Sequence, residues 1–195
     1  MTRPAPRSAT YQDVLDAPEH MVAEIINGRL ELSPRPAKPH AAAASALGEE
    51  LGPPFKRGKG GPGGWIILDE PELHLGSDVV VPDLAGWRRE RMPVITTEVS
   101  FFTLPPDWIC EVLSPSTERY DREEKLEIYR KSAVAYVWIV NPITRVLEAF
   151  VRSENTQWML DGVYSGATTP RVRPFDAIEL DLGNLWADVD LTGGA

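Results

Sequence analysis

Apolar and polar residues alternate over short stretches of this chain, a pattern typical of β-strands joined by turns. Residues 21–34 form two alternating runs separated by an Asn-Gly pair at 27–28, a strong signal for a tight β-hairpin. A second hairpin is predicted for residues 65–88, whose two runs flank Gly-Ser-Asp at 76–78. The chain is therefore expected to contain many short strands.

Two further runs are apolar almost throughout, WICEVLS at 108–114 and AYVWIVNP at 135–142. Strands buried on both faces have this composition. Both runs are therefore expected to be strands in the interior of a sheet.

Helices are predicted in three places. Thr10 and Asp13 form an approximate capping box for a short helix, and residues 40–51, HAAAASALGEEL, have high helix propensity. Asp121 and Glu124 have the spacing of a cap and mark the expected start of a third helix.

The rest of the chain is expected to consist of loops, strands and turns. The glycine-rich residues 56–64 predict a flexible loop, and the segment after residue 145 predicts further strands and turns. No internal repeat or interior linker divides the 195 residues. We therefore expect a single domain over residues 1–195, with residues 1–9 flexible.

The net charge of −9 argues against broad electrostatic attraction to nucleic acid or to anionic lipid. A local patch of basic residues is still compatible with this negative net charge. The single cysteine, Cys110, excludes an internal disulfide and a cysteine-based zinc site. The chain also lacks an apolar segment long enough to span a membrane and an apolar leader, so a cytoplasmic location without membrane contact is expected.

Two carboxylates interrupt apolar runs, and each has two interpretations. Asp83 follows three valines and Pro82, where it is either a ligand for a hard divalent cation or a turn acid at the end of a strand. Glu111 lies within WICEVLS, either as a buried functional acid or as an edge residue that faces solvent or pairs with arginine. Burying a carboxylate requires a proton, a cationic partner or a metal.

Lys125 lies four residues after Asp121 and four before Tyr129, which places all three on one helix face. Its ammonium either points at a metal-bound water or a phosphate, or forms an exposed pair with Asp121 while Tyr129 packs in the core.

Other polar residues carry weaker signals. His40 and Glu24 lie in a helix and a hairpin strand, where both are equally compatible with solvent exposure. Arg88, Arg89 and Arg91 either hold phosphates or form a solvated charge cluster. The motifs typical of NTPases, dinucleotide enzymes and serine hydrolases are absent.

Taken together, these segments resemble the PD-(D/E)XK nuclease superfamily. Within it they are similar to a large bacterial family of restriction-endonuclease-like proteins long classed as a domain of unknown function. The matching pieces are AEIINGRLELSPRPAKPH, VVVPDLAGWRRERMP and EVLSPSTERYDREEKLEIYRKSAVAYVWIVNP, between residues 23 and 142. The resemblance implies an α+β fold with a mixed central sheet, flanking helices and additional hairpins.

The resemblance also implies a set of site residues. Asp83 matches the PD acid and Glu111 the central-strand acid, but Leu113 stands where the motif has lysine, and Lys125 on the following helix matches the displaced lysine. Glu24 and His40 match recurrent positions, Asp121 and Tyr129 are supporting residues, and Arg88, Arg89 and Arg91 are weaker candidates for substrate binding.

The implied activity is a Mg²⁺- or Mn²⁺-dependent endonuclease that hydrolyses DNA and acts as a homodimer. Asp83, Glu111 and the carbonyl of Val112 would hold the ion, and Lys125 would orient water or stabilise charge. Two alternatives stay open: an inactive nuclease fold that binds nucleic acid or protein, and an interaction protein that uses its six tryptophans at a dimer interface.

Overall fold

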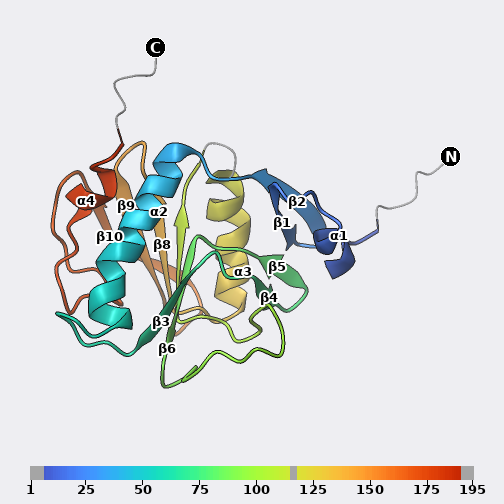
Figure 1. Cartoon of the computed structure of the whole chain (residues 1–195), viewed down its shortest axis with the longest axis horizontal. Coiled ribbons are helices and arrows are strands. Elements are labelled where there is room, and N and C mark those ends of the chain that lie inside the picture. The colour runs from blue at the N-terminus through green and yellow to red at the C-terminus, as the bar shows by residue number, and fades with distance from the viewer. Residues whose placement is uncertain (1–6, 115–117, 190–195) are drawn as a thin grey trace, which may run out of the picture.

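The computed structural model describes residues 7–114 and 118–189, and its centre is a mixed six-stranded sheet (Figure 1). The strand order is β10-β9-β8-β7-β6-β3, with β7 and β8 parallel and the other neighbours antiparallel. These strands are β3 (Trp65–Asp69), β6 (Leu84–Arg88), β7 (Trp108–Val112), β8 (Tyr136–Asn141), β9 (Val146–Arg152) and β10 (Trp158–Ser165). The mixed central sheet and the burial of β7 and β8 are as predicted.

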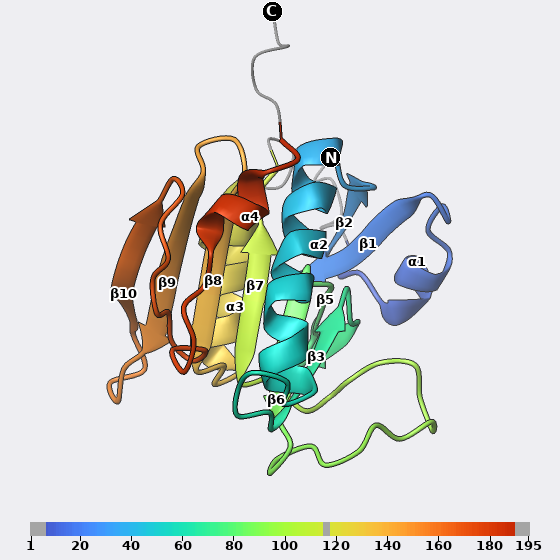
Figure 2. The ribbon, with the colours of Figure 1, turned by 60° about the vertical axis from the view of Figure 1, so that its left-hand side comes forward.

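Helices cover both faces of this sheet (Figure 2). The helical elements are α1 (Tyr11–Leu15), α2 (Lys38–Leu51), π-helical η1 (Gly52–Lys56) and η2 (Tyr120–Lys125), α3 (Leu126–Lys131) and α4 (Leu182–Trp186). α2 packs on one face, where Leu47 joins Trp108 and Cys110, and α3 packs on the other, where Ile128 joins Ile109. Successive side chains of β7 thus enter two separate cores. Within the described ranges, no helix combines the length and the apolar character that a membrane span requires.

A smaller antiparallel sheet lies beside the first, with the order β2-β1-β5-β4. Its strands are β1 (Met21–Ile26), β2 (Arg29–Pro34), β4 (Leu73–Leu75) and β5 (Asp78–Val80). The hairpin predicted for residues 21–34 is confirmed, with positive φ angles of 51° at Asn27 and 76° at Gly28. A tight turn of the mirror-image type requires this backbone conformation.

The hairpin predicted for residues 65–88 is divided between the two sheets. β3 pairs with β6 as far as Asp69 and Leu84, and β4 pairs with β5 around Gly76. Pro71 and Pro82 lie between the two ladders, and a proline has no N–H to continue a ladder. The break places Asp83 outside both ladders.

Two other sequence predictions were wrong in part. Residues 118 and 119 are already helical, so Asp121 lies inside η2 and does not mark the start of the helix. At the C-terminal end, α4 forms where only strands and turns were expected, and the Asp181 carboxylate accepts a hydrogen bond from the Gly183 N–H. Because α4 is one short turn of helix, its apolar residues lacked a visible helical period.

The glycine-rich loop expected to be flexible is hydrogen-bonded to η1. The N–H groups of Lys59 and Gly63 donate to the carbonyls of Pro53 and Pro54, each at 2.8 Å. A Cβ on Gly61 would lie 2.5 Å from the Cβ of Pro54, so the loop packs closely because this residue is glycine.

Part of the predicted flexible start also contacts the fold. Residues 1–6 of that segment lie outside the described residues. Arg7 pairs with Asp13, and the Ala9 N–H donates to the Gly28 carbonyl at 2.8 Å. The capping box formed by Thr10 and Asp13 at α1 is confirmed.

Candidate active site

Four charged side chains meet at a buried cluster between β1, β7 and η2. Lys125 Nζ lies 3.0 Å from Glu24 Oε1 and 3.1 Å from Glu111 Oε1. Asp121 Oδ1 lies 3.5 Å from the same ammonium. Lys125 and Asp121 are each 3% exposed, and Glu111 is 2% exposed. The interpretations of Lys125 as an exposed surface pair and of Glu111 as a solvent-facing edge residue are therefore wrong.

The cluster combines elements far apart in the sequence. Glu111 points from β7 toward the α3 side of the sheet, while Asp121 and Lys125 lie on the π-helical turn η2. One helical turn after Lys125, the buried Tyr129 donates its hydroxyl to Glu111 Oε1. On β1, Glu24 accepts a hydrogen bond of 2.7 Å from the N–H of Val81. π-helical turns occur often at functional sites, and this one presents a lysine and an aspartate to the same carboxylates.

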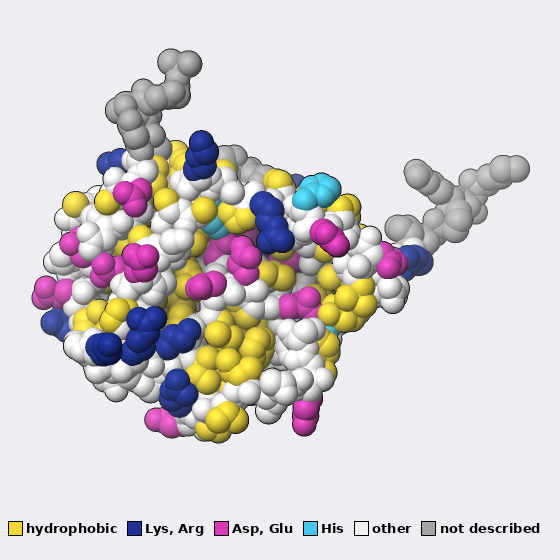
Figure 3. Space-filling view, viewed as in Figure 1, with side chains coloured by type: hydrophobic (Ala, Val, Ile, Leu, Met, Phe, Trp, Pro, Cys, Tyr) yellow, Lys and Arg dark blue, Asp and Glu magenta, His cyan; other side chains and the backbone are white. Residues whose placement is uncertain are grey.

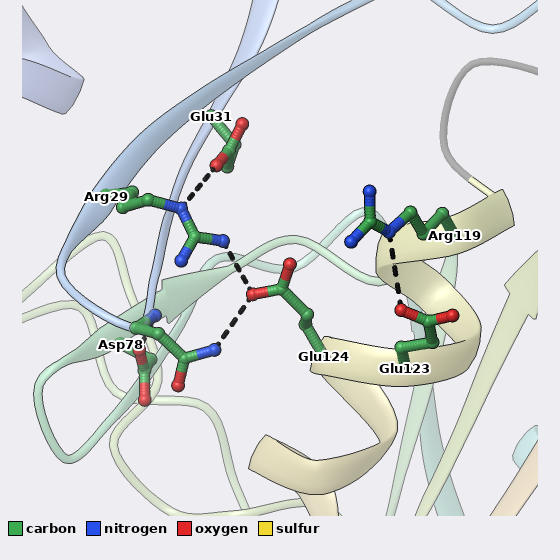
Figure 4. A network of polar contacts seen from close by, with 7 residues as sticks. Arg29, Glu31, Asp78, Arg119, Glu123 and Glu124 are labelled. Carbon is green, nitrogen blue, oxygen red and sulfur yellow. Dashed lines mark hydrogen bonds and ion pairs between the residues drawn. The ribbon is translucent and has the colours of Figure 1, made fainter.

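A polar network joins the β1–β2 hairpin to η2 (Figure 4). Glu124 Oε2 lies 2.7 Å from Arg29 Nη2 and 2.9 Å from Asn27 Nδ2, and the Asn27 N–H donates to Asp78 Oδ1 at 2.7 Å. Glu124 is the neighbour of Lys125 in the chain. The network therefore holds the hairpin that carries Glu24 against the helix that carries Lys125.

Asp83 lies where β6 begins, next to the end of β7. Its Oδ1 is 2.5 Å from His40 Nε2, and its Oδ2 accepts a hydrogen bond of 2.6 Å from the Val112 N–H. Leu84 pairs with Cys110, so Asp83 is adjacent to Glu111 across the two strands. Asp83 thus contacts the central strand β7 and helix α2, and it does not act as the turn acid of the second interpretation.

Asp83, Glu111 and Lys125 line one cavity of about 220 Å³. Its walls also include three predicted supporting residues, Glu24, His40 and Asp121. Residues 33–37, which comprise the end of β2 and its connector to α2, line the cavity as well. The tertiary structure therefore brings the three predicted catalytic residues together, with Tyr129 directly behind Glu111.

A second, larger hollow of about 600 Å³ adjoins this cavity and is here called the α2 groove. The two spaces share Pro36, His40, Glu70 and Asp83 in their walls. From there the α2 groove follows α2 to Lys56 and Arg57. Figure 3 shows acidic side chains in the middle of this face and a gathering of Lys and Arg side chains over the η1 end of α2.

Burial and neighbouring charges determine the protonation of the cluster. Burial raises the pKa of Glu111 well above its usual range, and the carboxylates of Asp121 and Asp83 raise it further, while Lys125 opposes the shift. Burial alone would lower the pKa of Lys125, but the carboxylates of Glu111 and Glu24 more than offset it and raise that pKa well above its usual value. Lys125 therefore stays charged.

The donor chemistry of the site fits a hard divalent cation. No three His, Cys, Asp or Glu side chains among the described residues are arranged around one ion. Mg²⁺, however, usually binds through only one or two carboxylates and keeps several waters, and Asp83 and Glu111 supply two. The N–H and C=O of a strand residue point to the same side, so the carbonyl of Val112 faces the side of Asp83.

The three candidate arginines lie at the other end of β6. Arg91 pairs with Asp107 at 2.9 Å, and the guanidinium of Arg88 lies 4.6 Å from the ring centre of Trp65. Arg89 donates to the Pro93 carbonyl. None of the three lines the cavity of Asp83 or the α2 groove.

Glu70 lines both spaces and was not predicted from the sequence. Its φ angle is +45°, a left-handed conformation that is uncommon for glutamate, and its N–H donates to the Asp83 carbonyl at 3.0 Å. Residues held in such conformations often lie at functional sites. The only signal in the sequence was the Glu-Pro pair at 70–71, which also occurs in ordinary turns.

Comparisons with known proteins give one family match and one similar fold. A family model described as "Uma2: Putative restriction endonuclease" matches residues 9–183. The fold is similar to the crystal structure of a protein from Anabaena variabilis described as "a putative nuclease belonging to DUF820". That match has a TM-score of 0.70 and 20% sequence identity, and it covers 92% of this chain and 98% of the other. No match was found among proteins with curated descriptions.

Proposed function

This chain belongs to the Uma2 family of restriction-endonuclease-like proteins, and we propose that it is a metal-dependent endonuclease that hydrolyses phosphodiester bonds in DNA. In this reaction a water oxygen bonds to phosphorus and one P–O ester bond breaks, which leaves a phosphate monoester and a free hydroxyl. The observation that supports the proposal best is the convergence of Asp83, Glu111 and Lys125 on one cavity.

Asp83 and Glu111 are proposed to hold Mg²⁺ or Mn²⁺, together with the carbonyl of Val112. When bound, the ion supplies Lewis-acid stabilisation of the phosphate and activation of water. The Val112 N–H and His40 fix the Asp83 carboxylate through hydrogen bonds of 2.6 Å and 2.5 Å. Both oxygens of Asp83 are therefore oriented before an ion arrives.

Lys125 is proposed to orient the attacking water or to stabilise negative charge on the phosphate. Its ammonium lies 3.1 Å from Glu111, so it acts beside the same carboxylate. Asp121 and Tyr129 position this pair, because Asp121 contacts the ammonium and Tyr129 donates to Glu111. Leu113, at the usual lysine position of the motif, is 3% exposed in the apolar core and leaves that role to Lys125.

The test is cleavage of supercoiled and single-stranded DNA with Mg²⁺ or Mn²⁺ by the parent protein and by Asp83→Asn, Glu111→Gln and Lys125→Met. Glu127→Gln is a matched control, since this side chain is 43% exposed on α3 and pairs with Arg130. We expect loss of cleavage in the three site variants and full cleavage in the control. Calorimetric titration with Mn²⁺ should show weaker binding by Asp83→Asn and retained binding by Lys125→Met.

Two results would contradict the proposal. Equal cleavage by the parent and all three site variants would place the activity elsewhere or in a contaminant. No cleavage by the parent under a broad range of metals and substrates would favour the inactive, nucleic-acid-binding alternative.

A further inference from the structure

We infer that the substrate of this site is a single DNA strand, which lies along the α2 groove with one phosphate at Asp83. The inference rests on the proposed function and adds the class of DNA and the path that it takes.

The site is too enclosed for an intact duplex. Glu111 and Lys125 are 2% and 3% exposed, and the cavity of about 220 Å³ above them is bounded on one side by residues 33–37. A phosphate of duplex DNA carries the paired strand with it, and the duplex is stiff over about 50 nm. A single strand can turn one phosphate into the cavity while its neighbours stay outside.

The α2 groove provides room for those neighbours. Its α2 wall is formed by Ala41, Ala44, Ser45 and Gly48, which are spaced three and four residues apart and share one helix face. Ala41 and Ser45 are exposed. Larger side chains at these positions would fill the hollow of about 600 Å³, so the small residues keep it open beside the catalytic cavity.

His40 lies where the two spaces meet and has one free ring nitrogen. The residue is 8% exposed, its Nε2 is bound to Asp83, and its Nδ1 has no hydrogen-bond partner among the described residues. A buried polar atom without a partner costs free energy. Because Nδ1 is itself inaccessible, His40 acts at this junction by holding Asp83 and not by contacting the nucleotide.

The far end of the α2 groove is positively charged. Arg57 is exposed, and no described residue forms an ion pair or hydrogen bond with its side chain. Lys56 donates to the Ile67 carbonyl at 2.8 Å and adds a second charge there. Glu49 and Asp69 line the middle of the groove and would repel a phosphate. The strand is therefore expected to place phosphates at Arg57 and Asp83, with base edges facing the carboxylates between them.

Binding tests this path without relying on cleavage. The affinity of a fluorescent oligothymidylate is measured by anisotropy in EDTA over a range of salt concentrations, for the parent, Arg57→Gln and the charge-matched control Lys131→Gln. Lys131 is 63% exposed and lies outside the α2 groove. Loss of one phosphate contact should weaken binding by about tenfold. It should also reduce the slope of log K against log salt by about 0.7. The control should change neither quantity.

A second pair of variants tests whether the groove must be open. Ser45→Trp fills the groove from an exposed position, and Ala42→Trp places the same side chain on α2 outside the groove lining. We expect Ser45→Trp to abolish oligothymidylate binding and Ala42→Trp to retain it, with circular dichroism to verify folding. If Ser45→Trp does not fold, the Arg57→Gln salt slope decides the question.

The two proposals can fail separately. Equal binding of the oligothymidylate by the parent, Arg57→Gln and Ser45→Trp, or cleavage of the annealed duplex as fast as the single strand, would overturn the single-strand path even if the protein is a nuclease. Groove-dependent binding of the single strand without cleavage would support the path and contradict the proposed activity.

Discussion

The two faces of strand β7 differ sharply in chemistry although they belong to the same five residues. On the α2 side, Trp108 and Cys110 enter an aromatic core in which the rings of Trp108 and Trp138 lie 5.2 Å apart at 80°. On the α3 side, Glu111 enters the charged cluster around Lys125. Both faces are almost fully buried.

Apolar side chains of β7 pack on both faces, Trp108 and Cys110 toward α2 and Ile109 toward α3, while the α3 face also carries the charged Glu111. Apolar burial and edge-to-face aromatic contacts are favourable in themselves. A buried ionic cluster is different, because desolvation of the charges can exceed their attraction. Three carboxylates around one ammonium on the α3 side are therefore weak evidence for stability, in keeping with the catalytic role proposed for this cluster.

The largest expected effect is the loss of Lys125, the cation among the four described side chains of the cluster. Lys125→Met leaves the carboxylates of Glu24, Glu111 and Asp121 buried without their ammonium. We expect a loss of about 3–5 kcal/mol in the free energy of unfolding, together with loss of cleavage. Urea denaturation measures the first and the DNA assay the second. An unchanged unfolding midpoint would mean that the carboxylates are already neutral in the folded protein.

A polar atom introduced on the opposite face of β7 should also lower the free energy of unfolding, but by less than the loss of Lys125. Cys110→Ser introduces a hydroxyl among apolar and aromatic side chains, where Cys110 is fully buried. We expect a loss of about 1–3 kcal/mol, measured by the same denaturation, while cleavage per folded molecule is retained. Equal stability of parent and variant would indicate that this face tolerates polar atoms, and the contrast between the faces would fail.

A double-mutant cycle measures the interaction inside the cluster. Glu111→Gln and Lys125→Met, alone and combined, should show a coupling energy of about 0.5–3 kcal/mol, because their side chains are 3.1 Å apart. The matched cycle of Glu127→Gln and Arg130→Met tests a partly exposed pair at 2.6 Å and should couple by less than about 1 kcal/mol. Equal coupling in the two cycles would contradict a special role for burial.

The pH dependence of the free energy of unfolding should reveal the titration of Glu111. Its folded-state pKa is raised above the usual 4.5 by burial, so the folded protein holds this proton more tightly than the unfolded chain. Its contribution to stability is therefore full below about pH 4.5 and decreases as pH rises toward the folded-state pKa, by at most about 1.4 kcal/mol per pH unit. Urea midpoints from about pH 4 to pH 8 should fall more steeply in the parent than in Glu111→Gln. Parallel curves would place the titration on another group.

Local sequence signals predicted the structure correctly where a short segment contains the residues that determine its own conformation. The hairpin at residues 21–34 follows from its Asn-Gly turn, and β7 follows from its apolar run. The hairpin at 65–88 was only half correct, because Pro71 and Pro82 interrupt its ladder and the two parts belong to different sheets. α4 was missed because its burial depends on packing against α2.

The sequence by itself determined the strands, the main helices and the types of residue at the site, because hydrophobic period, turn residues and helix propensity are local properties. It also supplied the pattern in which Asp83, Glu111 and Lys125 resemble a nuclease motif. Only the tertiary structure decided that Lys125 contacts three carboxylates at once, that His40 holds Asp83, and that the α2 groove meets the site at Glu70. These relations depend on the distances between segments that are remote in the chain, and no local pattern encodes those distances.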